Sequence, residues 1–201
     1  MSFLPTLPDR LLLPLRFDEK RMQADLAVLE ACEWTQHFVK QNFEGDWSII
    51  PLRGSAGATH PVMMIYSDPT CTDFADTPFL SRCEYLAEVL AAFPFPLDCV
   101  RLMKLTPGSV IKEHSDLDLA FESGAVRIHV PVTTNPGVDF QLNGSRLDLR
   151  EGTCWYLRLS DRHSVANHGE TDRVHLVIDA RRSPELDAWI ATLDVETEVA
   201  A

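Results

Sequence analysis

The side chains best suited to hold a metal ion lie between residues 102 and 180. His114 and Asp116 are two residues apart, so on an extended strand both point to the same face while Ser115 points away. An imidazole and a carboxylate in the same space can grip a divalent metal, and His163, on a later predicted strand, can supply a third ligand. Two histidines and one carboxylate with open coordination positions are typical of non-haem Fe(II) oxygenases. The alternative for His114 and Asp116 is a hydrogen-bonded pair without a metal.

Arg173 is the second feature that indicates a bound small molecule. It follows His163 by ten residues and opens the strand sequence Arg-Val-His-Leu-Val-Ile. A guanidinium is costly in an apolar strand unless its charge is paired, and its planar fork matches a carboxylate. A dicarboxylic cosubstrate that chelates the metal at one end and reaches Arg173 with the other would explain this residue. The alternative is an internal salt bridge to Asp148 or Asp179.

The order and spacing of these residues resemble those of a known family. The span 102–180 resembles the aspartyl/asparaginyl β-hydroxylase family of Fe(II)/2-oxoglutarate-dependent oxygenases, and is most similar to its bacterial members that hydroxylate free amino acids such as proline. The matching residues are Pro107-Gly108, His114-x-Asp116, Arg127-x-His129, Trp155, His163-Ser164 and Arg173-x-His175-Leu176-Val177.

The resemblance implies a role for each matched polar residue. The implied Fe(II) ligands are His114, Asp116 and His163. Arg173 is implied to bind the distal carboxylate of 2-oxoglutarate, and Arg127 and His129 to lie beside the cosubstrate or the substrate. The alternatives are a buried ion pair for Arg127 and a hydrogen-bonded core position for His129. The animal enzymes that gave the family its name lack the carboxylate ligand, so Asp116 separates this chain from that branch.

These observations predict an Fe(II)/2-oxoglutarate-dependent dioxygenase that uses O2 to hydroxylate an unactivated C–H bond of a free amino acid or of a residue in a small peptide. One alternative is a cupin-like metal enzyme that does not use 2-oxoglutarate, but such a site has no use for Arg173. The other alternative is a non-catalytic β-helix that binds a small molecule. That protein would be expected to have an incomplete ligand set.

Composition restricts the partners. The chain has 201 residues and a net charge of −12, which argues against nucleic acid or an anionic membrane as a partner and favours a small-molecule substrate. The apolar run from Leu11 is broken by Pro14 and is too short to span a membrane. Five scattered cysteines without a C-x-x-C pair indicate reduced thiols. We therefore expect a cytoplasmic protein, and the sequence leaves the oligomeric state open.

The pattern of apolar residues predicts helices at both ends of the chain and strands between them. Asp18 is the expected N-cap of a helix that runs to about Trp34, a second helix is expected at 79–92, and Ser183 is the expected cap of a third that runs to about residue 193. Strands are expected at 47–52, 98–105, 110–114, 125–132, 138–142, 145–149, 153–159, 163–166 and 173–179. From residue 98 onwards, many short strands without helices between them predict a mainly β fold with flanking helices, a double-stranded β-helix (jelly roll, cupin-like).

We expect one oxygenase domain over residues 1–201. In it a helical or mixed part, 1–96, packs on the core double-stranded β-helix, 97–180, and a C-terminal helix covers 183–194. Residues 1–17 are expected to add an edge strand or to lie over the core. Either of two loops, Arg53–His60 or Ser67–Pro78, is a candidate cover for the site. Candidate groups for a substrate carboxylate, each with an exposed surface charge as its alternative, are Arg53, His60, Lys104, Arg158 and Arg162.

Overall fold

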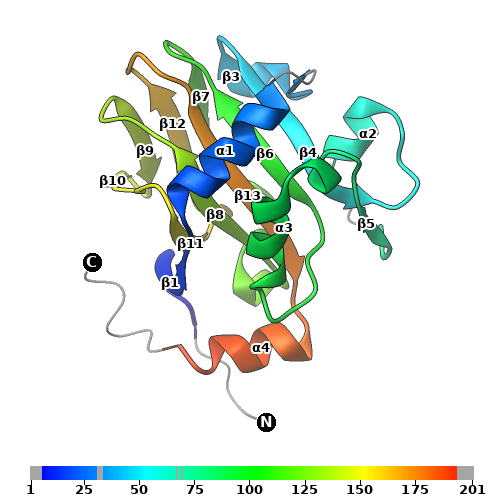
Figure 1. Ribbon diagram of the computed structural model, residues 1–201. Helices are drawn as coiled ribbons and strands as arrows, with labels where there is room; N and C mark the ends of the chain where they lie inside the picture. The colour runs from blue at the N-terminus through cyan, green and yellow to red at the C-terminus, as the bar shows by residue number, and fades with distance from the viewer. Residues whose placement is uncertain (1–5, 31–33, 67, 69, 194–201) are drawn as a thin grey trace.

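Two antiparallel β-sheets form the framework of the protein (Figure 1). The computed structural model describes residues 6–30, 34–66, 68 and 70–193. Within these residues the larger sheet has eight strands and the smaller sheet has five. The fold is the predicted double-stranded β-helix, mainly β with flanking helices.

The larger sheet combines strands from both halves of the chain. Its order is β1 (Arg10–Arg16), β11 (Thr153–Leu157), β8 (Ala125–Thr133), β13 (Arg173–Arg181), β6 (Val100–Leu105), β4 (Trp47–Ser55) and β2 (Thr35–Gln36), with β5 (Phe74–Asp76) paired to β4. Residues before 97 therefore supply strands to this sheet as well as helices that cover it. Of the two possibilities given for residues 1–17, the edge strand is the one observed in their described part, at Arg10–Arg16.

The smaller sheet closes the other side of the β-helix. Its order is β10 (Ser145–Leu147), β9 (Val138–Leu142), β12 (His163–Asn167), β7 (Val110–His114) and β3 (Phe43–Glu44). Asn143 and Gly144 connect β9 to β10 with φ angles of 52° and 72°. Both residues are left-handed, as a two-residue type I′ turn requires, so the predicted Asn-Gly hairpin is confirmed.

Helical segments lie outside the sheets. They are α1 (Glu19–Glu30), η1 (Lys40–Asn42), α2 (Pro61–Ile65), η2 (Leu80–Arg82), α3 (Glu84–Ala91), η3 (Phe121–Ser123) and α4 (Pro184–Ile190). The predicted caps are confirmed: Asp18 Oδ1 accepts from the N–H groups of Lys20 and Arg21, and Ser183 Oγ accepts from Leu186 N–H. No helix within the described ranges is long and apolar enough to cross a membrane.

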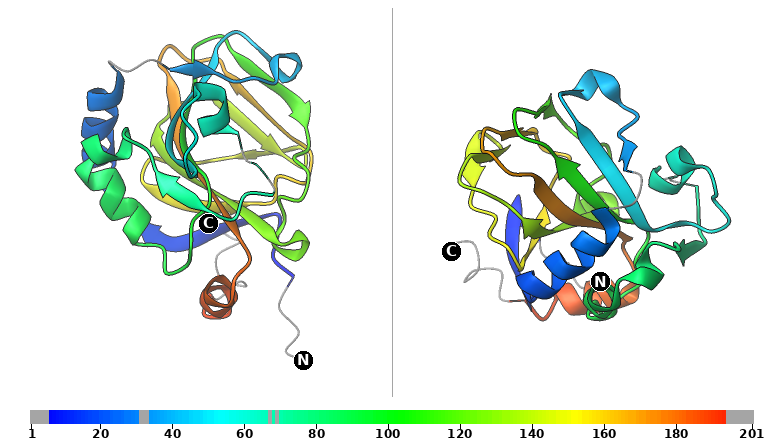
Figure 2. Two further views of the ribbon diagram at one scale, coloured as in Figure 1. Left: turned by 90° about the vertical axis from the view of Figure 1, so that its right-hand side faces the viewer. Right: turned by 45° about the horizontal axis from the view of Figure 1, so that its top comes forward.

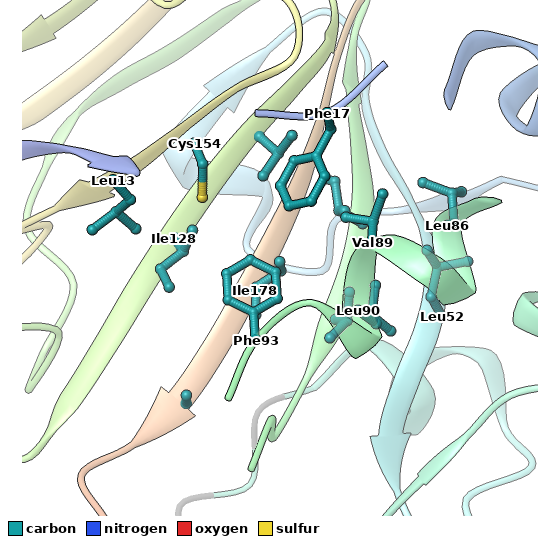
Figure 3. Packing of buried hydrophobic residues seen from close by; sticks show 14 of the residues in the cluster. Leu13, Phe17, Leu52, Leu86, Val89, Leu90, Phe93, Ile128, Cys154 and Ile178 are labelled. Carbon is teal, nitrogen blue, oxygen red and sulfur yellow. The ribbon is translucent and has the colours of Figure 1, made fainter. Parts of the chain in front are cut away.

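The outer core lies between the larger sheet and its helices. Alternate residues of β8 and β13, such as Ile128 and Ile178, point away from the smaller sheet and pack with Phe17, Val89 and Leu90 (Figure 3). Figure 2 shows α1 and α3 side by side over this face. The inner core lies between the sheets, and its members include Trp47, Met103, Phe140, Trp155 and Val177. The functional side chains share this inner space.

Several predicted boundaries differ from the structure. The strand at 47–52 continues to Ser55 because β5 pairs with its last three residues. The helix at 79–92 begins as a 3-10 turn and becomes α-helical only at Glu84. Three short strands, β2, β3 and β5, and the helix α2 were not predicted, since strands of two or three residues and a helix of five carry too little periodicity. The four cysteines that the structure describes form no disulfide, and Cys32 lies outside the described residues.

Candidate functional site

A small cavity between the two sheets brings the predicted site residues together. Its lining combines polar groups from both sheets with an apolar wall. The lining residues are Trp47, Met103, Ile111, His114, Asp116, Arg127, His129, Phe140, Leu159, His163, Val165, Arg173 and Val177. All six candidate residues of the predicted site are among them.

Two paired strands bring the two histidines of the candidate metal site together. His114 is the last residue of β7, His163 is the first residue of β12, and the two are direct partners in the antiparallel register. Their ring centroids are 4.3 Å apart. Asp116 Oδ1 lies 3.6 Å from His114 Nε2. One potential ligand atom from each of the three residues lies within 4.8 Å of the others, a spacing suited to a single ion.

Backbone carbonyl groups fix the tautomer of both histidines. His114 Nδ1 lies 2.7 Å from Lys112 O, and His163 Nδ1 lies 2.9 Å from Asp161 O. A carbonyl oxygen only accepts, so Nδ1 carries the proton in both rings and Nε2 keeps its lone pair. A metal ligand needs that lone pair, and the hydrogen bond at the other ring nitrogen fixes the ring orientation. Burial also lowers the pKa of His163, which favours its neutral form.

Asp116 reaches the site differently from the prediction. The strand β7 ends at His114, so the alternation of an extended strand does not orient Asp116. Two hydrogen bonds hold it instead. Its N–H donates to Leu159 O over 2.8 Å, and Arg127 donates to its Oδ2 over 2.6 Å. The second bond leaves Oδ1 as the oxygen beside His114.

Arg127 belongs to a buried network of alternating charges. Its Nε and one terminal nitrogen donate to the two oxygens of Asp179 over 2.7 and 2.9 Å, and its other terminal nitrogen donates to Asp116. Arg101 also donates to Asp179, and it donates to Ile65 O at the end of α2. Burial alone lowers the pKa of Arg127, but the charge and hydrogen bonds of Asp179 outweigh it and raise that pKa above its ordinary value. Arg127 therefore forms the buried ion pair that was the alternative to a position beside the cosubstrate.

Arg173 has a different environment. It is 2% exposed, and within the described part of the chain no carboxylate pairs with it. The two predicted salt-bridge partners bind other arginines: Asp148 pairs with Arg150, and Asp179 pairs with Arg101 and Arg127. The structure therefore removes the internal salt bridge as an explanation for Arg173. Burial without a counter-charge lowers the pKa of Arg173 to about 9.

Two histidines complete the polar end of the cavity. Arg173 donates to His175 Nδ1 over 2.8 Å, and His129 Nδ1 lies 3.2 Å from the same atom. Since arginine only donates, His175 Nδ1 is an acceptor and His129 Nδ1 carries a proton. His129 Nε2 is then a buried acceptor without a hydrogen-bond partner, and the Nε–H of Arg173 is a buried donor without one. Burial lowers the pKa values of His129 and His175 well below the ordinary value for histidine, so both rings are neutral.

The other candidate charges have structural partners. Arg53 binds Asp76 and two carbonyl oxygens, and His60 caps α2. Lys104 lies over the ring of Trp34. Arg158 donates to Leu7 O and to Glu122, and Arg162 pairs with Glu113 at the exposed surface. None of these five residues lines the cavity described above.

Sequence analysis missed one polar residue near the cavity. His37 lies between β2 and η1, and its ring stacks on Trp47, which lines the cavity, with centroids 3.7 Å apart. The charges of Arg101, Arg127 and Asp116 all act on its imidazole. His37 occurs in no recognisable motif and more than 70 residues before His114, so no spacing pattern connects it to the metal ligands.

The geometry agrees with a comparison against known families. The profile described as aspartyl/asparaginyl β-hydroxylase matches residues 17–183. The chain belongs to this family. The match extends well beyond the predicted span of 102–180 and includes α1, β4 and α3, so the family's common region covers most of the described fold.

Two curated relatives of this β-hydroxylase family member carry more specific names. L-proline cis-4-hydroxylase from Rhizobium meliloti (strain 1021) is 27% identical over 172 residues, which cover 82% of this chain and 58% of the relative. L-proline cis-3-hydroxylase 1 from Streptomyces sp is 23% identical over 168 residues, which cover 82% of this chain and 57% of the relative. The chain thus spans less than two thirds of the length of these relatives.

A solved structure supports the fold assignment. An oxidoreductase of the 2OG-Fe(II) oxygenase family from Burkholderia pseudomallei matches with a TM-score of 0.55 and 13% sequence identity. The alignment covers 87% of this chain and 86% of that chain. At this identity the similarity concerns the arrangement of the two sheets and not the substrate.

Proposed function

We propose that the protein is an Fe(II)/2-oxoglutarate-dependent dioxygenase that hydroxylates an unactivated C–H bond of a free amino acid. The proposal depends most on one observation: Arg173, a buried guanidinium without a carboxylate partner in the described chain, lines the same cavity as His114, Asp116 and His163. A metal alone would not require that positive charge. A dicarboxylate that binds the metal at one end would supply the missing negative charge at the other.

The donor set fits a ferrous ion. The two Nε2 lone pairs and Asp116 Oδ1 would hold the ion, and a set of two histidines and one carboxylate is the one that Fe(II) oxygenases use. With 2-oxoglutarate and O2, such an ion supplies the oxidising power that hydroxylates a C–H bond. The chain's own residues hold and orient the reactants. Arg127 keeps Asp116 Oδ2 engaged, and the apolar wall of Trp47, Met103 and Phe140 limits the access of water.

His129 is proposed to help bind the cosubstrate. Its ring lines the cavity beside Arg173, but its unpartnered Nε2 is an acceptor and cannot bind a carboxylate oxygen, whereas Arg173 Nε carries an unpartnered N–H that can donate to one. An unpaired buried polar atom costs about 1–3 kcal/mol, so a carboxylate that accepts from Arg173 Nε–H gains that energy on binding, and His129 is proposed to position the cosubstrate by contact. Arg127 is proposed to affect cosubstrate binding chiefly by holding Asp116 in place, because three of its nitrogens already donate to carboxylates.

The substrate class is proposed from the named relatives. Two of them, both about a quarter identical to this chain, are named as L-proline hydroxylases. A small cavity that combines charged groups with an apolar wall suits a small amino acid with a hydrocarbon ring or chain. A residue in a small peptide remains the second form of substrate that the site is proposed to accept.

Anaerobic titration of the apoprotein with Fe(II) and 2-oxoglutarate tests the cosubstrate assignment. The chelate has a weak visible charge-transfer band, which we expect in the wild type. In Arg173→Ala the band should require at least about 10- to 100-fold more 2-oxoglutarate, since a charge-assisted hydrogen-bonded pair is lost. Arg150→Ala is the matched control, because Arg150 is exposed and pairs only with Asp148 at the surface.

The outcomes separate the alternatives. A band of equal 2-oxoglutarate dependence in the wild type and in Arg173→Ala would remove Arg173 from the cosubstrate site. Normal Fe(II) binding without any band in the wild type would overturn the cosubstrate and favour a metal enzyme that does not use it. If the band forms, succinate release with L-proline and other free amino acids then identifies the substrate.

A further inference from the structure

The imidazole of His37 is held in one orientation at the edge of the candidate site. Its ring lies between those of Trp47, at 3.7 Å and 4° between planes, and Phe38, at 4.9 Å and 12°. The backbone is fixed as well, since His37 N–H donates to Trp47 O over 2.8 Å. Trp47 lines the metal cavity, whereas Phe38 is 42% exposed. His37 therefore lies between a residue of the cavity wall and an exposed residue.

One hydrogen bond determines which nitrogen of His37 carries the proton. Val39 N–H donates to His37 Nδ1 over 3.2 Å, so Nδ1 is an acceptor and the proton of the neutral ring is on Nε2. Burial, reinforced by the positive charges of Arg101 and Arg127, lowers the pKa of His37 to about 4. The ring is therefore neutral near pH 7. Among the described residues the side chain of His37 is hydrogen-bonded only at Nδ1, and stacking fixes its ring, so the Nε2–H is an oriented donor that a ligand can use.

The charged groups near His37 already have partners. Arg127 donates to Asp116 and Asp179, and Arg101 donates to Asp179. These two guanidinium groups and two carboxylates balance one another. An anionic group that arrives at this side of the cavity can take its first hydrogen bond from His37 without breaking an existing ion pair.

We propose that the Nε2–H of His37 binds the carboxylate of the free amino-acid substrate and thereby selects acids over amides. The inference rests on the proposed function and extends it to a residue that determines specificity. A hydrogen bond to a charged acceptor is stronger than one to a neutral acceptor. The same donor would bind a neutral amide carbonyl less tightly, and this difference gives the site its preference.

The test compares two substitutions at His37, one that keeps an aromatic ring and one that keeps an N–H donor. His37→Phe keeps an aromatic ring to stack on Trp47 but loses the N–H, whereas His37→Gln places an amide N–H near the same position without the ring. His168→Phe is the matched control, because His168 is exposed in a turn. Calorimetry on the zinc-substituted protein with 2-oxoglutarate, which does not turn over, measures binding of L-proline and L-prolinamide. Succinate release by the Fe(II)-loaded protein under O2 gives the Michaelis constants.

We expect His37→Phe to weaken L-proline binding by about 10- to 100-fold and to change L-prolinamide binding much less, so that the preference for the acid disappears. His37→Gln should keep most of the preference, and His168→Phe should keep all of it. A purely structural role for His37 predicts equal losses for acid and amide. Such equal losses, or unchanged selectivity in folded His37→Phe, would overturn the proposal.

Failure of the proposed function has a different signature. If the wild type forms no Fe(II)–2-oxoglutarate band, the oxygenase itself is wrong. If the band forms but no free amino acid binds or stimulates succinate release, the proposed substrate class is wrong. The proposed role of His37 is then wrong as well. If another amino acid is the substrate, that acid and its amide replace L-proline and L-prolinamide in the same comparison.

Discussion

At the scale of single residues, Asp179 connects two arginines that act on different parts of the site. It accepts from both Arg101 and Arg127, and it is 7% exposed. Through Arg127 it supports the orientation of Asp116, and through Arg101 it supports the last carbonyl of α2. Removing a buried carboxylate that pairs with two guanidinium groups is strongly destabilising, because both positive charges remain buried and lose this partner.

Asp179→Asn should therefore lower the free energy of unfolding by about 3–5 kcal/mol. Asp148→Asn is the control, since Asp148 and Arg150 are 75% and 76% exposed and such pairs contribute only about 0–1 kcal/mol. Urea denaturation of both apoproteins measures the difference. A loss below 1 kcal/mol in Asp179→Asn would mean that the two arginines find other partners, and that the network does not hold Asp116 as described.

The residues that sequence analysis could predict are those whose chemistry appears in a short pattern. His114, Asp116 and His163 are recognisable from ligand type, and the structure brings their ligand atoms within 4.8 Å of one another. The reason given for Asp116 was wrong, because its position depends on Arg127 and Leu159 and not on strand alternation. His37 was missed because its proximity to the cavity arises from the pairing of β2 with β4, and such long-range pairing leaves no local signal.

At the scale of elements, one face of β13 packs in the outer core and the other face borders the cavity. Leu176 and Ile178 point into the outer core, while Arg173, Val177 and Asp179 line or border the cavity. Periodicity predicted this strand and most of its neighbours correctly, since each buries a regular row of apolar side chains. The short strands β2, β3 and β5 escaped prediction because their pairing is decided by tertiary contacts.

The β9–β10 hairpin offers a test at this scale. Gly144 has φ 72°, and a Cβ added there would meet no atom within 4 Å. Gly144→Ala should therefore lower the free energy of unfolding by about 1–2 kcal/mol through backbone strain alone. Ser145→Ala, at the adjacent exposed position, should have little effect. Thermal melting of the two variants checks this, and equal stability would show that the turn adopts another conformation.

At the scale of the whole molecule, the polar site is built inside the inner core. His37, His129 and His175 are neutral because burial lowers the pKa of each, to about 4 for His37 and well below its ordinary value for the other two. An unfolded chain exposes all three rings to water, where the pKa of histidine is about 6.5. Below that pH the unfolded state binds more protons than the folded state, so acid destabilises the fold.

The free energy of unfolding of the apoprotein should therefore fall as the pH decreases from 7 to 5.5. Each of the three histidines contributes a slope of up to about 1.4 kcal/mol per pH unit below pH 6.5, and the contribution disappears at higher pH. Urea denaturation at several pH values measures the slope. His168→Gln should leave it unchanged because His168 is exposed, whereas a slope near zero in the wild type would mean that the buried rings are protonated in the fold.

Because both faces of β13 are needed, this strand also limits how the substrate preference of such a protein can change during evolution. A mutation on either face of this strand affects a packed core or a charged cavity, so few substitutions there are tolerated. The segments that carry His37 and α2 contribute less to either core and have exposed side chains, among them Phe38 and Tyr66. New substrate preferences within this lineage should therefore arise by drift in those peripheral segments, while the strand that holds Arg173 stays nearly constant.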